Sequence, residues 1–349
     1  MSSTLTNDFN SALERFWGLL TSETTLYVLK RLAQGLLTLL LASALSFAII
    51  QFAPGSYLET IQADPKITQE TIEEIKVKFG LDKPPIVQYG LWLWQVVTRF
   101  NFGTSFVFSR SVSSLLLERV PATLLLAITT IIVTWAIAIP LGIFGAVKQN
   151  SASEKVLRLI SYLGQGFPSF ITVLVLLIVA QSLSPLLPVG NLTSLDHDEL
   201  TPFGKIVDIA WHMILPTIAL SITSFAGLQR LMRGQLLDVL RQDYIQTARA
   251  KGLPENRVIY VHALRNAINP LITLLGFEFA SLLGGSFIAE FYFNLPGLGR
   301  LILQAVTAQD LYLVMGSLMM GAAMLILGNL LADLLLKAID PRIKLEDLK

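Results

Sequence analysis

Six long apolar runs limit what this chain can fold into more than any other feature of its sequence. A helix that crosses a lipid bilayer needs about 20 mostly apolar residues, and each run reaches that length. Five runs carry no charge and one contains only Glu278; the six cover residues 32–58, 120–147, 159–195, 209–229, 266–289 and 311–332. Of the 349 residues, 53% are hydrophobic and only 15% are charged, whereas a soluble domain carries about 25% charge. The sequence therefore predicts an all-α, polytopic membrane protein with six transmembrane helices.

The third run, residues 159–195, is too long for a single membrane helix. Its second half contains residues that are typical of turns, namely Pro185, Pro188, Gly190 and Asn191. We therefore expect the helix to end near Ser182. Close to its start lie three residues that can kink a helix, although static packing is the favoured interpretation of them: Gly164, Gly166 and Pro168.

Lysine and arginine predict the orientation of the helices, since short loops rich in these residues stay in the cytoplasm. Basic residues precede the first run, follow the second and sixth, and are densest after the fourth, between Arg230 and Arg265. The segment between the third and fourth runs is mainly acidic, with Asp196, Asp198, Glu199 and Asp208. Both termini are therefore expected in the cytoplasm.

These features divide the chain into five parts. We expect a cytoplasmic tail (1–29), a first transmembrane helix (30–52), an external segment with short helices (53–117), a core with five transmembrane helices (118–343) and a second cytoplasmic tail (344–349). The first tail contains apolar residues that suit either a helix on the membrane surface or a flexible tail: Phe16, Trp17, Leu19 and Leu20.

The external segment, residues 53–117, combines helix and turn signals. Gly80 is placed to end a helix that begins near Thr71, and Pro84-Pro85 is placed to open a second helix. Trp92 and Trp94 in that helix suit the membrane interface, with the ring in lipid and the N–H in water. The segment is either a small cap without chemistry or a docking surface for an external partner.

The cytoplasmic loop, residues 231–265, is predicted to contain two short helices separated by a glycine. Gly252 follows Arg249 and Lys251, which is where a helix would end, and Pro254 suits the first turn of the next helix.

Small residues surround this break in the loop. Ala248, Ala250 and Gly252 carry little side-chain bulk, so the backbone of another protein would be able to approach closely. We interpret the loop as a contact surface for a second protein; an ordinary basic loop is the alternative.

Several kinds of chemistry are excluded by residues that the sequence lacks. It has no cysteine, which rules out disulfides, thiolate metal sites and iron–sulfur clusters. It has no G-x-x-x-x-G-K-[ST] motif and therefore no P-loop of its own. We expect no metal site and no catalytic residue in this chain; His197 lies among acidic residues, where a solvated loop is favoured over a loose metal site. No basic patch with interleaved aromatic residues supports nucleic-acid binding.

The run Gln246-Thr247-Ala248-Arg249-Ala250-Lys251-Gly252 resembles the E-A-A-x-x-x-G motif of the permease subunits of bacterial ABC importers. The second alanine and the glycine match at Ala248 and Gly252. Gln246 and Thr247 replace the glutamate and the first alanine, and the usual I-x-L-P ending is matched only at Leu264.

Further stretches resemble the dipeptide, oligopeptide and nickel subfamily of these permeases. They are Ala53-Pro54-Gly55, Gly80-Leu81-Asp82-Lys83-Pro84, Phe102-Gly103-Thr104-Ser105, Leu117-Glu118-Arg119-Val120-Pro121-Ala122-Thr123, Glu290 with Pro296-Gly297-Leu298-Gly299-Arg300, and Asp340-Pro341-Arg342. The long external segment resembles that of the first-type permease chain of peptide systems.

The resemblance implies a type I ABC importer permease fold and uptake of di- or oligopeptides across a bacterial plasma membrane. Nickel or another small solute such as glutathione is the alternative ligand within the family. The implied partners are a second homologous permease chain, two ABC ATPase subunits and an extracytoplasmic substrate-binding protein. ATP and Mg²⁺ would be bound by the ATPase subunits, so this chain would need no cofactor and would not be an enzyme.

The same resemblance implies that the region 244–254 is a coupling helix that lies in a groove of the ATPase. The residues that it assigns to this contact are Asp243, Tyr244, Gln246, Thr247, Ala248, Arg249, Lys251, Gly252 and Leu253.

Glu278 is the only carboxylate well inside a predicted span, where a charge costs about 2.5–3.5 kcal/mol on insertion scales. It is a candidate for the transport pathway, where it would pair with the amino terminus of a peptide. A protonated side chain or a hydrogen bond to the partner permease are the alternatives. An ion-coupled secondary transporter with Glu278 as coupling residue is the alternative from a different class, which usually shows internal repeats that are not evident here.

Overall fold

The computed structural model describes residues 23–52, 62, 68–183 and 186–339. The expectations for the first tail before residue 23, for Ala53-Pro54-Gly55 and for Asp340-Pro341-Arg342 lie outside these residues. The helices are α2 (Glu23–Phe52), α4 (Gln69–Phe79), α5 (Pro85–Arg99), α6 (Val112–Val147), α7 (Ala152–Gly166), α8 (Ser169–Ser182), η1 (His197–Glu199), α9 (Pro202–Leu240), α10 (Asp243–Ala250), α11 (Glu255–Arg257), the π-helix η2 (Val258–Ala263), α12 (Leu264–Ala267), α13 (Asn269–Gly285), α14 (Phe287–Tyr292), α15 (Leu298–Thr307) and α16 (Leu311–Ile339).

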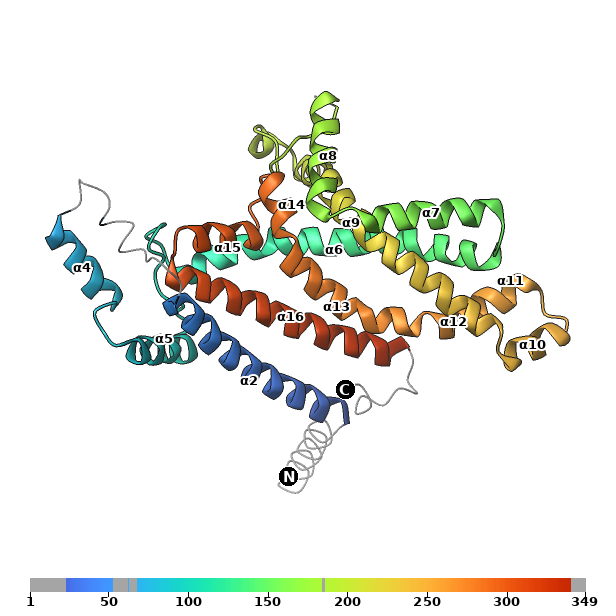
Figure 1. Ribbon diagram of the computed structural model, residues 1–349, viewed down its shortest axis with the longest axis horizontal. Coiled ribbons are helices and arrows are strands. Elements are labelled where there is room, and N and C mark those ends of the chain that lie inside the picture. The colour runs from blue at the N-terminus through green and yellow to red at the C-terminus, as the bar shows by residue number, and fades with distance from the viewer. Residues whose placement is uncertain (1–22, 53–61, 63–67, 184–185, 340–349) are drawn as a thin grey trace, which may run out of the picture.

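The long helices form an elongated bundle. Helices α4 and α5 lie at one end, and α10 to α12 lie at the other end beside the α6–α7 turn (Figure 1). Apart from one isolated β-bridge between Thr104 and Ser111, the regular structure in the described residues is helical. The predicted all-α class is confirmed.

Six membrane spans can be counted, of which two are broken. Among the described residues, α2, α6, α9 and α16 are each long and apolar enough to cross a membrane. Helices α7 and α8 form a pair bent by 102°, and residues 255–267 form a second pair with α13, bent by 48°. Counting each bent pair as one span gives the predicted number.

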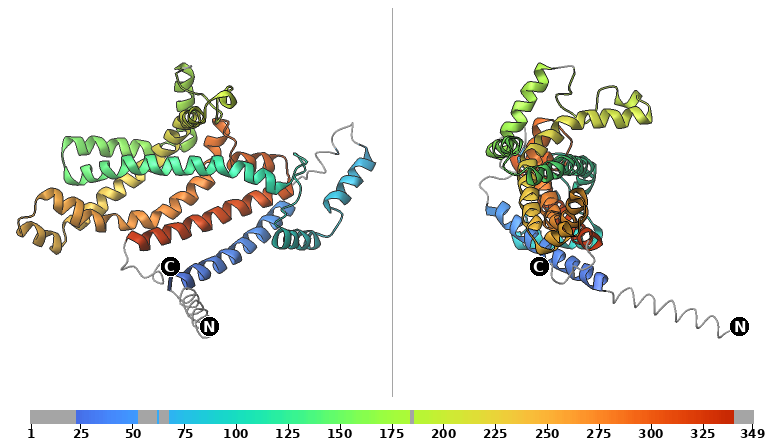
Figure 2. Two further views of the ribbon diagram at one scale, coloured as in Figure 1. Left: turned by 180° about the vertical axis from the view of Figure 1, so that it is seen from behind. Right: turned by 90° about the vertical axis from the view of Figure 1, so that its right-hand side faces the viewer.

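The third span differs from the single helix that the sequence predicts. The chain leaves α7 at Phe167, which has extended backbone angles (φ −94°, ψ 130°), and α8 begins after Pro168. A proline disfavours helical angles in the residue before it, so Phe167 ends α7. Helix α7 lies along α6 and α9, whereas α8 turns away from the bundle and ends at Ser182, as predicted (Figure 2).

A close helix contact in the core joins α6 to α9. A Cβ atom added at Gly142 would lie 2.6 Å from the Met232 side chain and 2.9 Å from the Gln229 backbone oxygen. Thr129 and Thr217 share a hydrogen bond of 3.1 Å further along the same contact. Glycine at position 142 therefore sets how near the two membrane helices can approach.

A buried carboxylate fixes the turn between α14 and α15. Glu290 accepts hydrogen bonds from Thr123 (2.7 Å), Ser286 (2.9 Å) and the Arg300 backbone N–H (3.0 Å), and it is fully buried. A Cβ atom at Gly297 would collide with this carboxylate. The Glu290 and Pro296–Arg300 run that carries part of the family resemblance is thus one structural unit that caps α15.

Polar contacts also join α2 to α16. Asp333 accepts a hydrogen bond of 2.6 Å from Tyr27 and pairs with Arg31 at 3.3 Å, while Lys337 donates to Thr24 at 2.6 Å. These contacts lie in the first turns of α2, which begins at Glu23, ahead of the expected start at residue 30.

The helices of the external segment follow the sequence prediction in part. Gly80 has φ +68° and follows α4, and α5 starts at Pro85, both as predicted, although α4 begins at Gln69. The expectation for Trp92 is wrong, because its ring is buried and its N–H donates to the Phe102 carbonyl at 3.0 Å. Trp94 is exposed, and its position at a membrane interface stays a prediction.

The α6–α9 contact yields a stability prediction. Gly142→Ala should lower the thermal stability of the purified protein in detergent, because the new methyl group meets backbone as well as side-chain atoms of α9 and forces the helices apart. Overpacking of this kind costs about 1–3 kcal/mol.

The matched control is Gly234→Ala, because a Cβ atom at Gly234 in α9 meets nothing within 4 Å. This variant should be as stable as the parent or more so, since alanine favours helix by about 1 kcal/mol over glycine. Equal melting temperatures for the Gly142 and Gly234 variants, measured by size-exclusion after heating, would contradict the proposed packing.

Candidate functional site

The predicted cytoplasmic loop is largely a continuation of membrane helices. Helix α9 runs past the predicted end of its span at Gln229 and reaches Leu240, so the first part of residues 231–265 belongs to α9. A short break at Arg241 and Gln242, which the sequence pattern did not indicate, separates α9 from α10. The nine residues assigned to coupling all lie in α10 and the turn that follows it.

The turn after α10 is built around Gly252. This residue has φ +76°, a conformation that costs other residues energy, and no atom lies within 4 Å of the position that a Cβ atom would take. Its N–H donates to the Arg249 carbonyl (2.9 Å), and the Leu253 N–H donates to the Ala248 carbonyl (3.4 Å). This is the Schellman arrangement, and the prediction that Gly252 ends the helix is confirmed.

Two side-chain contacts brace this turn. The Arg249 guanidinium donates two hydrogen bonds to Glu255, at 2.7 and 3.2 Å, which bridge the turn and raise the pKa of Arg249 above its ordinary value. Asn266 in α12 donates to the Tyr244 hydroxyl at 2.8 Å. Helices α10, α11 and α12 are therefore tied together by side chains as well as by the backbone.

One face of α10 packs on its own chain. Ile245 is fully buried and Ala248 is almost so, in a cluster with Leu236, Met232 and Val258. The interpretation that Ala248 leaves room for a partner's backbone is therefore wrong; its small side chain lets α10 pack closely on this cluster. Leu253 is half-buried against the same cluster.

The other face of α10 is open. Its exposed members are Asp243, Tyr244, Gln246, Thr247, Ala250, Lys251 and Gly252. Beside it, a groove of about 330 Å³ runs between the ends of α6 and α9 and the α10–α11 turn, and its polar walls include Gln149, Arg241, Gln246, Arg249 and Glu255. This arrangement offers a rigid, polar surface at the end of the bundle that can receive side chains of another protein.

Two basic residues of the predicted loop do not belong to this open surface, because they contact other helices of the same chain. Arg233 pairs with the buried Glu154 of α7 at 3.1 Å. Arg230 donates to Gln165 and lies 5.1 Å from the centre of the Tyr162 ring. The exposed basic residues around α10 are therefore Arg241, Lys251, Arg257 and Arg265.

The spacing Ser151-x-x-Glu154, a helix-capping pattern, is the sequence signal that places Glu154 near a helix start.

The π-helix η2, Val258–Ala263, directly follows the α10–α11 turn. Such wide turns are rare and occur often at functional sites. Nothing in the sequence pattern distinguishes it from ordinary helix, so it was not predicted. It belongs to the first half of the bent span whose second half, α13, carries Glu278.

Glu278 lies far from α10, on α13. Its half-buried carboxylate accepts a hydrogen bond of 2.8 Å from the Trp135 indole N–H of α6. The structure thus places Glu278 at the contact between two membrane helices and gives it an uncharged partner.

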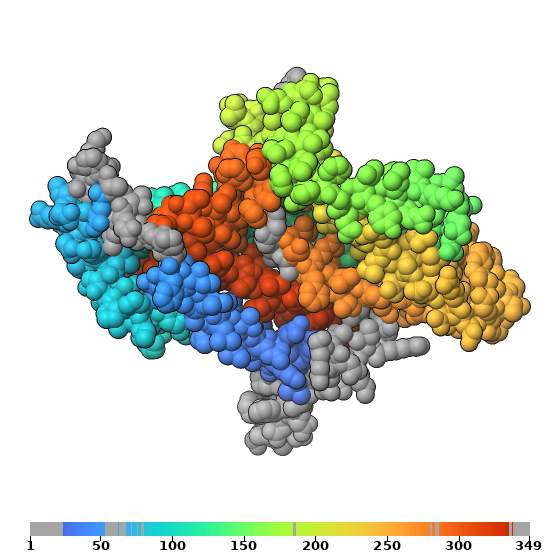
Figure 3. Space-filling view, in the orientation of Figure 1, coloured from blue at the N-terminus to red at the C-terminus, as the bar shows by residue number. Residues whose placement is uncertain are grey.

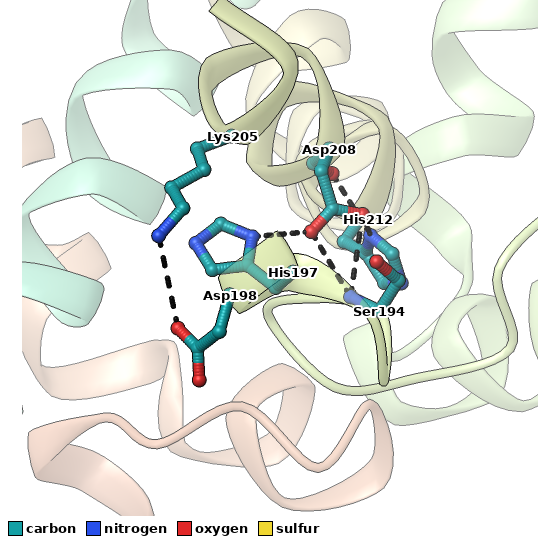
Figure 4. Close-up of polar contacts among 6 residues, drawn as sticks. All are labelled: Ser194, His197, Asp198, Lys205, Asp208 and His212. Carbon is teal, nitrogen blue, oxygen red and sulfur yellow. Dashed lines mark hydrogen bonds and ion pairs between the residues drawn. The ribbon is translucent and has the colours of Figure 1, made fainter. Parts of the chain in front are cut away.

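A second polar cluster lies between the loop after α8 and the start of α9 (Figure 4). Asp208 accepts hydrogen bonds from the Ser194 N–H (3.0 and 3.2 Å) and contacts Nδ1 of His197 at 2.6 Å, while His212 Nδ1 lies 3.2 Å from the same carboxylate. His197 is therefore held by Asp208 and is not paired with its acidic neighbours in sequence. Within the described residues, no group of three or more histidine, cysteine or acidic side chains is placed to hold a metal ion.

Two family models match this chain over most of its length. Residues 138–345 match "Binding-protein-dependent transport system inner membrane component", and residues 25–127 match the corresponding N-terminal model, "Binding-prot-dependent transport system membrane comp, N-term". The first match contains α10 with the Gly252 turn, and the second contains most of α2 together with α4 and α5.

Whole-chain relatives agree with the family models. The oligopeptide transport system permease protein AppB of Bacillus subtilis is 39% identical over 319 residues, 91% of this chain and 99% of the relative. A putative peptide transport system permease protein of Brucella abortus is 35% identical over 92% of this chain and 99% of its own length.

A solved structure supports the fold. An inward-facing MetNI methionine ABC transporter contains a chain that matches with a TM-score of 0.51 and 16% identity, over 65% of this chain and 96% of that chain. With the helices described above, this confirms the type I importer permease fold that the resemblance implies. The chain belongs to the inner-membrane permease components of binding-protein-dependent transport systems, the membrane subunits of ABC importers.

Proposed function

We propose that this chain is one of two homologous permease subunits of an ATP-driven importer that takes up di- and oligopeptides. The observation that carries this proposal is the open face of α10, braced by the Gly252 turn at the end of the bundle, in a chain of the permease family. The names of full-length relatives, which are oligopeptide and peptide permeases, support peptides over nickel or glutathione as ligands. Family membership favours an importer subunit over an ion-coupled transporter.

The proposed partners divide the work of transport. An extracytoplasmic binding protein delivers the peptide, two ABC ATPase subunits bind ATP and Mg²⁺, and the permease pair forms the pathway. The lack of a P-loop motif in this sequence supports the placement of ATP chemistry in the partner chains. The chain itself carries no catalytic residue in this scheme.

The proposed orientation places α10 to α12 and both termini in the cytoplasm of a bacterium, with the chain in the plasma membrane. The exposed basic residues at the α10 end, including Arg241 and Lys251, support it, since loops rich in lysine and arginine stay inside. The acidic segment around Asp196 and Asp198 then lies outside.

Helix α10 is proposed to couple the movement of the ATPase to the membrane helices by moving as a rigid unit. Its open face, with Tyr244, Gln246 and Lys251, contacts the ATPase, while Ile245 and Ala248 seat it on α9 and η2. Because α10 packs on α9 and its residues are hydrogen-bonded to the segment that follows Gly252, a displacement imposed by the ATPase moves the end of α9 and the start of α13 with it. The groove beside Arg241 and Arg249 would receive acidic or polar side chains of the ATPase.

Glu278 is proposed to face the transport pathway. A carboxylate inside a membrane span usually faces the bundle interior or a water-filled cavity, and this one is only half-buried within the chain. In that position it would pair with the amino terminus of a peptide.

The coupling proposal predicts that Gly252→Pro uncouples ATP hydrolysis from uptake in proteoliposomes of the whole transporter. Proline cannot adopt the positive φ and lacks the N–H that bonds to Arg249, so the turn must rearrange. Peptide uptake per ATP hydrolysed should fall roughly tenfold or more, equivalent to about 1.4 kcal/mol of lost coupling, while membrane insertion is retained.

Gly252→Asn is the matched control, because asparagine tolerates the left-handed conformation. It should keep most of the coupling. Normal transport by the proline variant would refute the assignment, as would equal loss in both variants.

The pathway proposal predicts that Glu278→Gln changes which ligands are taken up. Uptake of peptides with a free amino terminus should decrease relative to N-acetylated peptides, because the variant keeps the hydrogen bond from Trp135 and loses only the charge. Trp135→Phe serves as control, since it removes the hydrogen bond and keeps the carboxylate. Unchanged uptake of ligands of every charge by the Gln variant would show that Glu278 does not face the pathway.

A further inference from the structure

Helix α5 has two different faces. The face that carries Gln88, Trp92 and Val96 is buried in the protein. The opposite face is apolar and open: Ile86, Trp94 and Val97 are 86%, 65% and 67% exposed, and the partly exposed Val87 and Leu91 lie at its side. At 100° per residue these positions point away from the buried set.

The buried face attaches α5 to two membrane helices at one end of the bundle, and the residue after α5 contacts a third. Trp92 and Val96 form a cluster with Phe47 of α2 and with Leu311 and Met315 in the first turns of α16. The Phe100 carbonyl, just after α5, accepts a hydrogen bond of 3.1 Å from Ser113 at the start of α6. Helix α5 is therefore held at the level where α6 and α16 begin.

Helix α5 also lies beside the outer surface of α2. The Tyr89 and Ser43 hydroxyls are 2.9 Å apart, and the Phe47 and Tyr89 rings are 5.4 Å apart. The outward residues of α2 are apolar and largely exposed, among them Leu41, Leu45 and Ile49, and α2 is long and apolar enough to cross a membrane. Figure 3 shows α5 next to α2 on the outside of the bundle.

The composition of α5 suits lipid better than water. Its single charged residue is Arg99 in the last turn, where a long side chain can reach the headgroups. A tryptophan such as Trp94 is favoured at the membrane–water boundary. An open apolar face of this kind is unusual on a surface that meets only water.

We propose that the exposed face of α5 lies in the bilayer at the boundary between acyl chains and headgroups, as an interfacial anchor of the external segment. With 15 residues, α5 is too short to cross a hydrocarbon core that needs about 20. It lies on the membrane and fixes the external ends of α2, α6 and α16 relative to its surface. Under the proposed orientation, this is the outer leaflet; contact with lipid does not depend on which leaflet it is.

The natural absence of cysteine makes the test direct. A nitroxide spin label is attached to Trp94→Cys and, as a second site, to Val97→Cys, in the full-length chain with its co-purifying partners. The complex is reconstituted in vesicles of phosphatidylethanolamine and phosphatidylglycerol. Collision of the label with oxygen, which concentrates in lipid, is compared with collision with a water-soluble nickel chelate.

Two further sites calibrate the measurement. Asp82→Cys lies in the exposed loop before α5 and reports water, and Val96→Cys lies on the buried face and reports protein. We expect the labels at positions 94 and 97 to collide several times more with oxygen than with nickel, relative to the label at position 82.

Two results would overturn the proposal. Labels at 94 and 97 that behave like the one at 82 would show that the face meets water. Labels shielded from both reagents, as at 96, would show that another protein covers it. Peptide uptake is measured on the same preparations, so a failure of the transport assignment is seen separately from a failure of the lipid contact.

Discussion

The close contact between α6 and α9 is the interaction on which the rest of the structure depends. Glycine at position 142 lets the two membrane helices approach until Met232 and the Gln229 carbonyl fill the space that a side chain would need. The same apolar cluster continues past the ends of these helices to Ile245, Ala248 and Val258. The candidate coupling surface is thus packed on α9 and η2, in an apolar cluster that also contains residues of α6. Such continuous packing is the physical requirement for transmitting movement from this surface into the membrane helices.

Buried or half-buried polar groups complete the arrangement at positions where the helices begin, end or meet. Glu290 caps α15 and binds Thr123 of α6, while Asp310 starts α16 and accepts hydrogen bonds from Ser105 and Val107. Asp333 joins α16 to α2 through Tyr27. Unpaired polar groups are costly away from water, so each of these carboxylates defines where a neighbouring segment must lie. These carboxylates therefore hold the ends of α2, α15 and α16 in place. The surfaces that stay open include one face of α10 and the outer faces of the membrane helices and of α5.

Sequence patterns predicted those features that depend on local chemistry. The six apolar runs, the end of α4 at Gly80 and the end of α10 at Gly252 follow from hydropathy and from the conformational freedom of glycine. Features that depend on distant partners were missed or misread: the buried positions of Trp92 and Ala248, the Arg233–Glu154 pair and the contact of His197 with Asp208. A kink near Phe167 is predictable from the sequence, because Pro168 is a residue that can kink a helix. The size of the bend is not predictable in this way, because it depends on packing against α9. The π-helix η2 has no local signature.

The proposed coupling mechanism requires that the open face of α10 meets an ATPase. A benzophenone attached to Gln246→Cys on that face, in the transporter as it exists in native membranes, tests this contact directly, with Asp82→Cys at the other end of the bundle as control. We expect light to join the chain to a P-loop ATPase from position 246 and not from position 82. Equal labelling from both positions, or no ATPase product from position 246 in a preparation that hydrolyses ATP, would contradict the mechanism.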